Sequence, residues 1–345
     1  MAEGKPRLRP AGEPANSLGL HRADYGGGPS TLCAGCGHDS VSAAIIEACW
    51  SAAVAPEAVA KMSGIGCSSK TPGYFLNRAH GFNAVHGRMP AVTTGAAVAG
   101  RDLLFLGVSG DGDSASIGCS HFAHGIRRGL DMVYIVENNG IYGLTKGQFS
   151  ATADRGSVGL KGAVNTEVPI DPVLFALNMG AGFVARSFSG DKQHLVPLIR
   201  AALFYRGFAL IDVISPCVSF NNHDGSTRSY HAARENIRMV NRLEPVDVAA
   251  ESGDDLVLEG GDGCRLRVIP ADHWNPVEFT PVFNGVQSSQ EEGRFLTGLL
   301  YYRDPRARPG MHEYLNTVPT PLRHLHPADL CPGAEVLRDL NEEWR

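Results

Sequence analysis

GDGDSASIGCSHFAHGIRRGLDMVYIVENNGIYG, residues 110–143, is the stretch that decides the fold. The apolar run just before it, residues 103–108, predicts a buried strand that ends at the Gly-Asp-Gly-Asp turn. Residues 114–129 can form a helix, and residues 132–136 predict a second buried strand that ends at the Asn-Asn pair. Two strands joined by a helix in this way are expected to be parallel, with a right-handed crossover.

Because parallel strands run in the same direction, the polar ends of both strands are expected on one edge of the sheet. Such sheets bind ligands at that edge, outside the carboxyl ends of their strands. Asp111 and Asn139 can then meet around one hard cation. Mg²⁺ takes oxygen ligands, and Asp111, the side chain of Asn139 and the carbonyl of Ile141 can supply the protein's share beside a diphosphate. The competing interpretation is two unrelated turns, since Gly-Asp-Gly alone is common. The spacing, the two apolar strands and the Asn-Asn-Gly-Ile-Tyr-Gly ending together favour the magnesium site.

Composition excludes several classes of protein. The chain has 345 residues, 43% of them hydrophobic, which supports one large or two ordinary domains with a real core. A net charge of −5 without a long basic run argues against nucleic acid as a partner, and no apolar stretch is long enough to span a membrane. Residues 1–14 lack the apolar core of a signal peptide and are expected to belong to an extended arm, residues 1–30. Eight irregularly spaced cysteines in a chain of cytoplasmic character favour metal or redox chemistry over disulfides.

The rest of the chain alternates helix and strand patterns and predicts an α/β fold, a mostly parallel sheet with helices on both faces. Helices are predicted at residues 39–54, 89–100, 172–179 and 192–205, and further strands at 59–65, near 183 and at 208–214. Residues 144–165 are a Gly-, Thr- and Ser-rich loop, and a loop of that length is usually functional or mobile. Residues 227–243 predict a polar-faced helix and residues 254–269 a hairpin. Residues 246–345 are expected to be a C-terminal extension that packs on the body or on a partner chain.

Several short segments carry a resemblance to known enzymes. They are CAGCGH at 33–38, GIGCSS at 64–69, HGR at 86–88, GDGD at 110–113, NNGIYGLTKGQ at 138–148 and SPC at 215–217. In this order they resemble the thiamine-diphosphate enzymes, and more closely the β subunit of the 2-oxoacid:ferredoxin oxidoreductases. Residues 297–301, TGLLY, look like the end of the 2-oxoglutarate-type β subunits.

The resemblance implies a thiamine-diphosphate-binding fold, with the diphosphate-binding and iron–sulfur domain at residues 31–245. The implied cofactors are thiamine diphosphate, Mg²⁺ and one 4Fe–4S cluster. The residues implied to contact the cofactor are Gly37, His38, Ile65, Gly66, Cys67, Ser68, His86, Gly112, Asp113, Asn139, Gly143 and Leu144.

Four cysteines are the candidate ligands of the cluster, because a Cys₄ site needs thiolates that converge on loops. Cys33 and Cys36 form a chelating pair, and Cys67 and Cys217 each follow a predicted parallel strand. The family pattern picks the same four. A structural zinc site, or four free thiols, is the alternative.

Two side chains in the matching loops, His86 and Lys70, are the candidate catalytic residues, although a lone cation in a polar segment is usually solvated or structural. The sequence offers no convincing glutamate for the aminopyrimidine ring of the cofactor. The resemblance implies that this residue comes from a partner α subunit, so that the chain holds half of an active site.

The implied function is that of the β subunit of a 2-oxoacid:ferredoxin oxidoreductase, with 2-oxoglutarate as the preferred substrate. Such an enzyme decarboxylates the 2-oxoacid oxidatively to acyl-CoA and CO₂ and passes single electrons through the cluster to ferredoxin. The expected partners are the α subunit, in a heterodimer or dimer of heterodimers, ferredoxin, the 2-oxoacid and coenzyme A. Three alternatives stay open: a pyruvate-specific member of the family, a non-oxidative decarboxylase or synthase with incidental cysteines, and a zinc-stabilised interaction protein.

Overall fold

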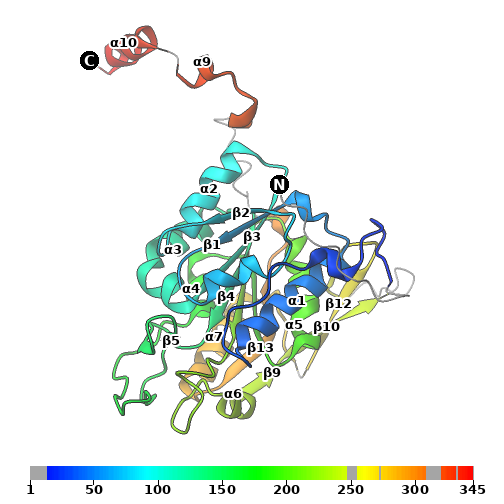
Figure 1. Cartoon of the computed structure of the whole chain (residues 1–345), viewed down its shortest axis with the longest axis vertical. Coiled ribbons are helices and arrows are strands. Elements are labelled where there is room, and N and C mark those ends of the chain that lie inside the picture. The colour runs from blue at the N-terminus through cyan, green and yellow to red at the C-terminus, as the bar shows by residue number, and fades with distance from the viewer. Residues whose placement is uncertain (1–13, 247–254, 272, 308–319, 332, 345) are drawn as a thin grey trace.

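An eight-stranded sheet forms the centre of the computed structural model, which describes residues 14–246, 255–271, 273–307, 320–331 and 333–344 (Figure 1). In spatial order its strands are β2 (His80–Asn83), β1 (Val59–Ser63), β3 (Leu104–Gly110), β4 (Met132–Asn138), β8 (Phe208–Ile214), β7 (Phe183–Phe188), β13 (Phe295–Tyr302) and β9 (Ile237–Met239). The strands from β2 to β7 are mutually parallel. The predicted parallel α/β sheet is confirmed.

The predicted strand–turn–helix–strand unit occupies the middle of this sheet. β3 and β4 pair in parallel, with Gly110 opposite Glu137. Every residue of β4 is buried, as is expected of a central strand covered on both faces. The predicted helix between them is interrupted, because the chain makes a π-helical turn over Gly112–Ile117 before α3 (Cys119–Arg127) begins. A π-turn of this kind is common at functional sites.

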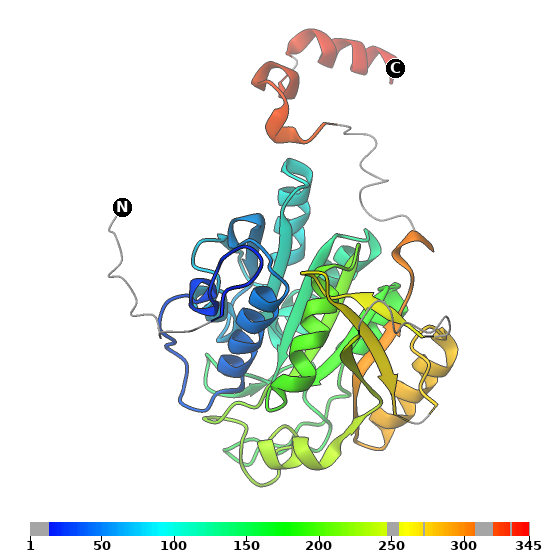
Figure 2. The same ribbon diagram turned by 90° about the vertical axis from the view of Figure 1, so that its right-hand side faces the viewer.

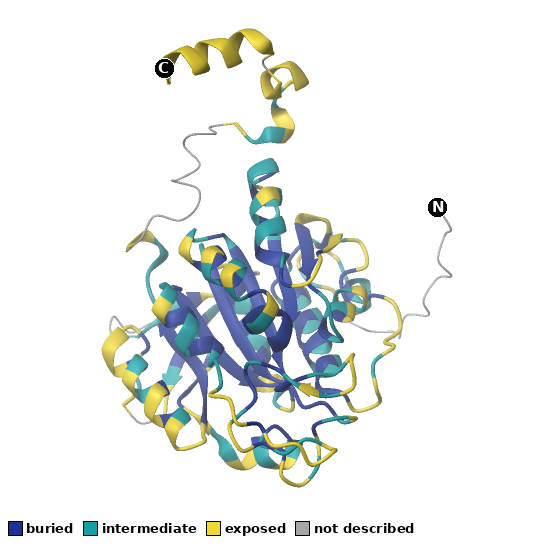
Figure 3. Cartoon of the chain, turned by 90° about the vertical axis from the view of Figure 1, so that its left-hand side faces the viewer, coloured by how far each residue is buried: buried dark blue, intermediate teal, exposed yellow. Residues whose placement is uncertain are grey.

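Helices cover both faces of the sheet (Figure 2). On one face, α1 (Gly37–Ser51) and α5 (Lys192–Leu203) bury an apolar cluster that includes Ile45 and Leu198. On the other face lie α2 (Met89–Ala99), α3, α4 (Pro172–Met179) and α7 (Phe279–Glu291). Figure 3 shows the strands as the most deeply buried part of the chain.

The predicted helix at residues 227–243 is wrong over most of its length. Only α6 (Tyr230–Asn236) is helical, and the chain then forms β9 and β10 (Asn241–Val246). Asn241 and Leu243 are buried while Arg242 is exposed, which is the alternation of a strand. The apolar residues of this segment therefore serve two sheets rather than one helix face.

The C-terminal part of the chain joins the body through strands. β10 pairs with β12 (Arg265–Pro270), which also pairs with β11 (Val257–Glu259), so the expected hairpin is confirmed. β13 is antiparallel to β7 and extends the main sheet. The segment expected to be an extension thus contributes to the central sheet as well as packing on it.

The described C-terminal helices α9 (Pro327–Leu330) and α10 (Ala334–Glu343) project from the body and are exposed (Figures 1 and 3). Of the expected arm, residues 1–13 lie outside the described residues, and Asn16 ties the following part to Tyr25 and to the backbone of Trp50. Among the described residues, no helix is both long and apolar enough to cross a membrane.

Candidate active site

A cavity of about 180 Å³ lies at the carboxyl edge of the parallel strands. Its walls come from the segments that follow β1, β3 and β4, as the sequence predicts for ligand sites in such sheets. The residues that line it are His38, Ile65, Gly66, Cys67, Ser68, His86, Gly110, Asp111, Gly112, Asp113, Ile117, Glu137, Asn139, Ile141, Tyr142, Gly143, Leu144 and Thr145.

Asp111 is held from a distant loop. Its side chain is buried, and its Oδ2 atom accepts hydrogen bonds from the hydroxyls of Ser150 and, at 2.7 Å, of Thr152. Burial raises the pKa of Asp111, although these hydrogen bonds act in the opposite direction. A cation beside the carboxylate would offset the remaining cost of burial.

Asn139 and Ile141 lie directly beside this carboxylate. The backbone N–H of Asn139 donates to Oδ1 of Asp111 at 3.3 Å, and the N–H of Ile141 donates to the side-chain oxygen of Asn139 at 3.0 Å. The structure therefore brings a carboxylate and an amide oxygen together and holds the backbone of Ile141 beside them. Carboxylate, amide and carbonyl oxygens are the donors that Mg²⁺ prefers. The three residues predicted for the metal fit it by their chemistry and proximity.

Asp113 has a different environment, although it lies only two residues away. Its carboxylate accepts hydrogen bonds from the N–H of Ile65 at 3.3 Å, from the N–H of Gly87 at 2.8 Å and from the hydroxyl of Ser109 at 2.7 Å. These bonds join the loops after β1 and before α2 to the acidic turn. Asp113 thus fixes the walls of the cavity through these three bonds.

Glu137 is the third carboxylate of the cavity, and it has no hydrogen-bond partner. Its side chain is fully buried, and neither of its oxygens has a donor within hydrogen-bond reach. His38 approaches it, with 3.6 Å between Nδ1 and Oε2, but that nitrogen lies 2.7 Å from the hydroxyl of Ser215. Burial lowers the pKa of His38 to about 4, so the imidazole is neutral at pH 7. Burial also raises the pKa of Glu137 well above its usual range.

The four predicted cluster cysteines converge beside the cavity. The Sγ atoms of Cys67 and Cys217 lie 3.7 and 3.6 Å from the position that a Cβ on Gly143 would occupy. The Cys33–Cys36 turn is closed by a 3.0 Å backbone hydrogen bond. The next residue, Gly37, donates its N–H to the carbonyl of Pro216 at 3.3 Å, which seats the turn against the loop that carries Cys217.

Buried thiols of this kind need a compensating charge before they can be thiolates. Burial raises the pKa of Cys36 to about 12 and also raises the pKa of Cys67 and of Cys217. The backbone N–H groups of Phe220, Ser219 and Asn221 oppose this effect at Cys217 by favouring the thiolate. Amide donors aimed at ligand sulfurs are a feature of iron–sulfur sites.

Among the described residues, no group of three or more His, Cys, Asp or Glu side chains is close enough to bind a single metal ion. This finding argues against a tight zinc site made of these cysteines. It is compatible with a four-iron cluster, which sits between its thiolates and keeps them apart. It is equally compatible with Mg²⁺, because an amide and a carbonyl supply two of the three proposed ligands.

The remaining predicted residues differ in how close they are to the cavity. His86 lines it from an exposed loop. Lys70 is exposed and does not line the cavity. It lies near Cys67, where burial raises the pKa of the thiol and the charge of Lys70 acts in the opposite direction. Gly37 is also outside the lining, and a Cβ there would clash with the hydroxyls of Ser215 and Ser189.

Sequence reasoning missed three residues of the site, Glu137, Ser150 and Thr152. A charged side chain at the end of an otherwise apolar central strand was the available signal for Glu137. The hydroxyls of Ser150 and Thr152 belong to the loop that was expected to be functional or mobile, and nothing in the sequence connected them to Asp111.

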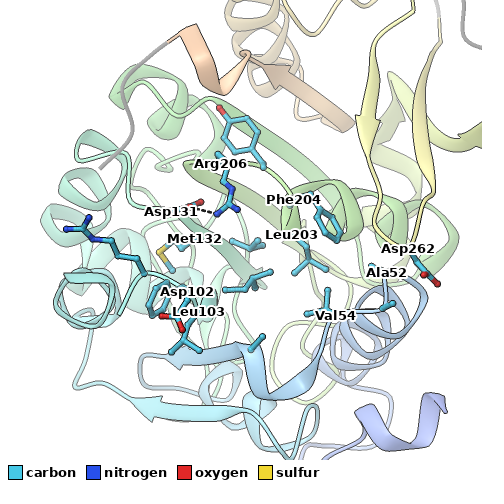
Figure 4. A pocket seen from close by; sticks show the side chains of 18 of the residues that line it. Ala52, Val54, Asp102, Leu103, Asp131, Met132, Leu203, Phe204, Arg206 and Asp262 are labelled. Atoms are coloured by element: carbon cyan, nitrogen blue, oxygen red, sulfur yellow. Dashed lines mark hydrogen bonds and ion pairs between the residues drawn. The ribbon is translucent and has the colours of Figure 1, made fainter. Parts of the chain in front are cut away.

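A larger hollow, about 540 Å³, opens at the opposite edge of the sheet (Figure 4). It lies at the amino ends of β3 and β4 and is lined mainly by apolar side chains, including Val54, Leu103 and Phe204. The ion pair drawn there joins Arg206 to Asp131 at 3.3 Å and is exposed on the arginine side. None of the predicted motifs reaches this edge, so the smaller polar cavity is the better candidate for chemistry.

The chain is similar to known thiamine pyrophosphate enzymes. Residues 64–213 match the thiamine pyrophosphate enzyme, C-terminal TPP binding domain. The chain is 37% identical over 235 residues to the 2-oxoglutarate oxidoreductase subunit KorB of Mycobacterium tuberculosis, covering 68% of this chain and 62% of that protein. It is 36% identical over 246 residues to a 2-oxoacid:ferredoxin oxidoreductase subunit beta of Sulfolobus, covering 69% of this chain and 80% of that protein.

A solved structure is also similar over most of its length. It is the 2-oxoglutarate:ferredoxin oxidoreductase from Magnetococcus marinus with 2-oxoglutarate, coenzyme A and succinyl-CoA bound. The TM-score is 0.71 at 29% sequence identity, covering 87% of this chain and 89% of that chain.

Proposed function

Since the chain belongs to the β subunits of the 2-oxoacid:ferredoxin oxidoreductases, we propose that it is the thiamine-diphosphate-binding and electron-transferring half of such an enzyme. One observation carries the proposal. A cavity walled by oxygen donors suited to Mg²⁺ and four converging thiols lie side by side at one edge of the sheet. A non-oxidative thiamine enzyme does not need the four thiols, and a zinc-stabilised interaction protein does not need the cavity suited to Mg²⁺.

The residues of the chain divide the work. Asp111, Asn139 and the Ile141 carbonyl would hold Mg²⁺ and through it the diphosphate, while Asp113 keeps the cavity walls in place. Thiamine diphosphate supplies the carbanion chemistry of 2-oxoacid decarboxylation when it is bound. The side chains of Asp111, Asp113 and Glu137 are buried in the cavity wall, where electrostatic contacts are stronger than in water.

The thiols of Cys33, Cys36, Cys67 and Cys217 would hold the 4Fe–4S cluster. Their loops neighbour the loops that would hold thiamine diphosphate, and a cluster bound there would supply one-electron transfer. Ferredoxin is the proposed acceptor because relatives of the chain carry it in their names.

The proposed substrate is 2-oxoglutarate, converted with coenzyme A to succinyl-CoA and CO₂. Relatives named for 2-oxoglutarate and the substrates bound in the Magnetococcus marinus structure support this choice. A second substrate carboxylate needs a cation, and Lys70 is free to approach because it is exposed beside Cys67. Arg78, a further cation eight residues along the chain, is paired with Glu57. His86 reaches the cavity and would contact the substrate there.

The chain is proposed to work with an α subunit in the cytoplasm, as a heterodimer or dimer of heterodimers. The β-subunit names of its relatives imply such a partner. None of the described carboxylates other than Asp111, Asp113 and Glu137 lines the cavity, and the aminopyrimidine glutamate is proposed to come from the partner.

The test is anaerobic purification of the chain with its partner, followed by metal, sulfide and cofactor analysis. We expect about four iron and about four sulfide per chain, bound thiamine diphosphate, and acyl-CoA formation that is fastest with 2-oxoglutarate. Faster turnover of pyruvate would assign the chain to the pyruvate-specific members. A colourless, zinc-containing protein without thiamine diphosphate would exclude the proposed function.

Asp111→Ala separates the two cofactors. This change removes the only carboxylate proposed for Mg²⁺ and should abolish Mg²⁺-dependent binding of thiamine diphosphate while leaving iron and sulfide at wild-type levels. Calorimetric titration with the cofactor and colorimetric iron analysis measure the two effects. Unchanged cofactor affinity would show that the metal is held elsewhere.

A further inference from the structure

Glu137 is a buried charge-bearing group that neither the magnesium site nor the cluster site uses. Its side chain is 0% exposed, it lines the cavity, and both of its oxygens lack a hydrogen-bond partner. A buried carboxylate in this condition is expensive, and native structures rarely leave one without a role.

The described residues offer Glu137 no permanently charged partner in the cavity. The cavity lining contains no Lys or Arg among the described residues. The nearest basic group, His38, is neutral and has its Nδ1 directed at Ser215. The other ionisable groups close to Glu137 are Asp39, Cys36 and Cys67, which are acidic. Among the described residues, a positive partner for the ionised form of Glu137 could therefore come only from a ligand.

The position of Glu137 in the cavity indicates where the positively charged part of a ligand would lie. Glu137 lies near the end of β4 and Asn139 directly follows that strand, so both line the cavity from the same strand end. The end of the cavity at Asn139 suits Mg²⁺ and a diphosphate, whereas an anion at the Glu137 end would be repelled. The cavity thus fits a ligand with an anionic end and a cationic end a few ångströms away.

We propose that Glu137 binds the positively charged thiazolium ring of thiamine diphosphate and selects for that charge. The inference rests on the proposed function, because it requires this cofactor in this cavity. It adds a binding residue that the sequence motifs do not include, and it gives the unpartnered carboxylate a role. Glu137 would interact with the charge of the ring, so removing the charge of Glu137 should not weaken binding of a neutral ring of the same shape.

The test compares two ligands on two proteins. The ligands are thiamine diphosphate and deazathiamine diphosphate, in which a neutral thiophene replaces the thiazolium ring. Their dissociation constants are measured by isothermal titration calorimetry, at saturating Mg²⁺, on the complex with the partner subunit. The proteins are the wild type and Glu137→Gln, which keeps the shape of the side chain and removes its charge.

We expect Glu137→Gln to raise the dissociation constant of thiamine diphosphate by about 10- to 100-fold, in the range measured for buried charge contacts. The constant of the neutral analogue should change by less than about threefold, a difference close to the usual uncertainty of such contacts. Glu47→Gln, the same chemical change at an exposed ion pair with Arg22, is the matched control and should leave both constants unchanged.

Three results would overturn the inference. Equal weakening of both ligands would mean that Glu137 only supports the cavity, and a melting temperature measured alongside would reveal such a structural role. Unchanged affinity for both ligands would mean that Glu137 does not meet the ring. If the wild-type complex binds neither ligand, the proposed cofactor itself is wrong, which is a distinct failure because it appears before any substitution is made.

Discussion

Replacing Thr152 by Val should weaken Mg²⁺ binding, although Thr152 is not itself a proposed ligand of the metal. Thr152 is fully buried and donates its hydroxyl proton to Oδ2 of Asp111 at 2.7 Å. Ser150 donates to the same oxygen, and the one further donor to this carboxylate among the described residues is the N–H of Asn139, at 3.3 Å. Two hydroxyls therefore fix the carboxylate, and Val keeps the shape of Thr while removing one of them.

The size of the effect follows from these contacts. A hydrogen bond to a charged group contributes about 1.5–3 kcal/mol. Ser150 still donates to the carboxylate, so the loss should fall near the lower limit, and about 1.4 kcal/mol corresponds to a tenfold change in affinity. Loss of a group that orients a metal ligand typically weakens binding by about 10- to 100-fold, which agrees with this value. We expect the Mg²⁺ dissociation constant, measured with thiamine diphosphate present, to rise about tenfold.

Thr93→Val is the matched control. Thr93 is equally buried, and its hydroxyl donates to the carbonyl of Met89 at 2.8 Å inside α2, away from the cavity. It should lose a little stability and no Mg²⁺ affinity. If Thr152→Val and Ser150→Ala both bind Mg²⁺ as the wild type does, the loop hydroxyls do not orient Asp111 and the reasoning fails.

Three further predictions test other parts of the structure. Cys217→Ser should lower the iron content from about four to less than one per chain. Cys49→Ser, at a buried position of α1 in the apolar core, should keep the iron content, and iron loss in both variants would indicate misfolding instead. Arg186→Met leaves two buried carboxylates without their shared cation and should lower the free energy of unfolding by about 3–5 kcal/mol in urea melts, so a wild-type midpoint would count against this ion pair. Burial acts to raise the pKa of Asp154, but the ion pair with Arg228 outweighs it and lowers that pKa. The ion pair therefore stabilises the fold above about pH 4, and this stabilisation is lost as the pH falls further. The difference in unfolding free energy between wild type and Asp154→Asn should be full at pH 7 and close toward pH 2, and a difference independent of pH would refute the prediction.

The local parts of the site were predictable because they lie at strand ends. The strands around residues 110–143 are apolar and short, their parallel pairing follows from the helix between them, and parallel pairing puts Asp111 and Asn139 at one edge. The same argument brought Cys67 and Cys217 to that edge. Each of these inferences needed only the residues next to a strand and a general rule of chain topology.

The parts that could not be predicted depend on contacts far apart in the sequence. Ser150 and Thr152 meet Asp111 across about forty residues, and a hydroxyl in a polar loop has no pattern that names its partner. β13 reaches the main sheet from the end of the chain, and its neighbour β9 reads like part of a helix because Ile237 and Val240 are three residues apart. Local spacing favoured the helix, and the pairing of β9 with β13 overrode it.

The buried polar contacts also explain why the loop after β4 belongs to the site rather than to the surface. Thr152 contacts both Asp111 and the side-chain oxygen of Asn138, and Asn138 donates to Asp212 at 3.0 Å. Asp212 in turn pairs with Arg186 at 2.7 Å. A continuous path of hydrogen bonds and one ion pair therefore joins the proposed metal ligand to the interior of the sheet. Because a half-satisfied buried network is unstable, the loop must dock before Asp111 can take its binding geometry, and a bound cation should in turn stabilise the docked loop.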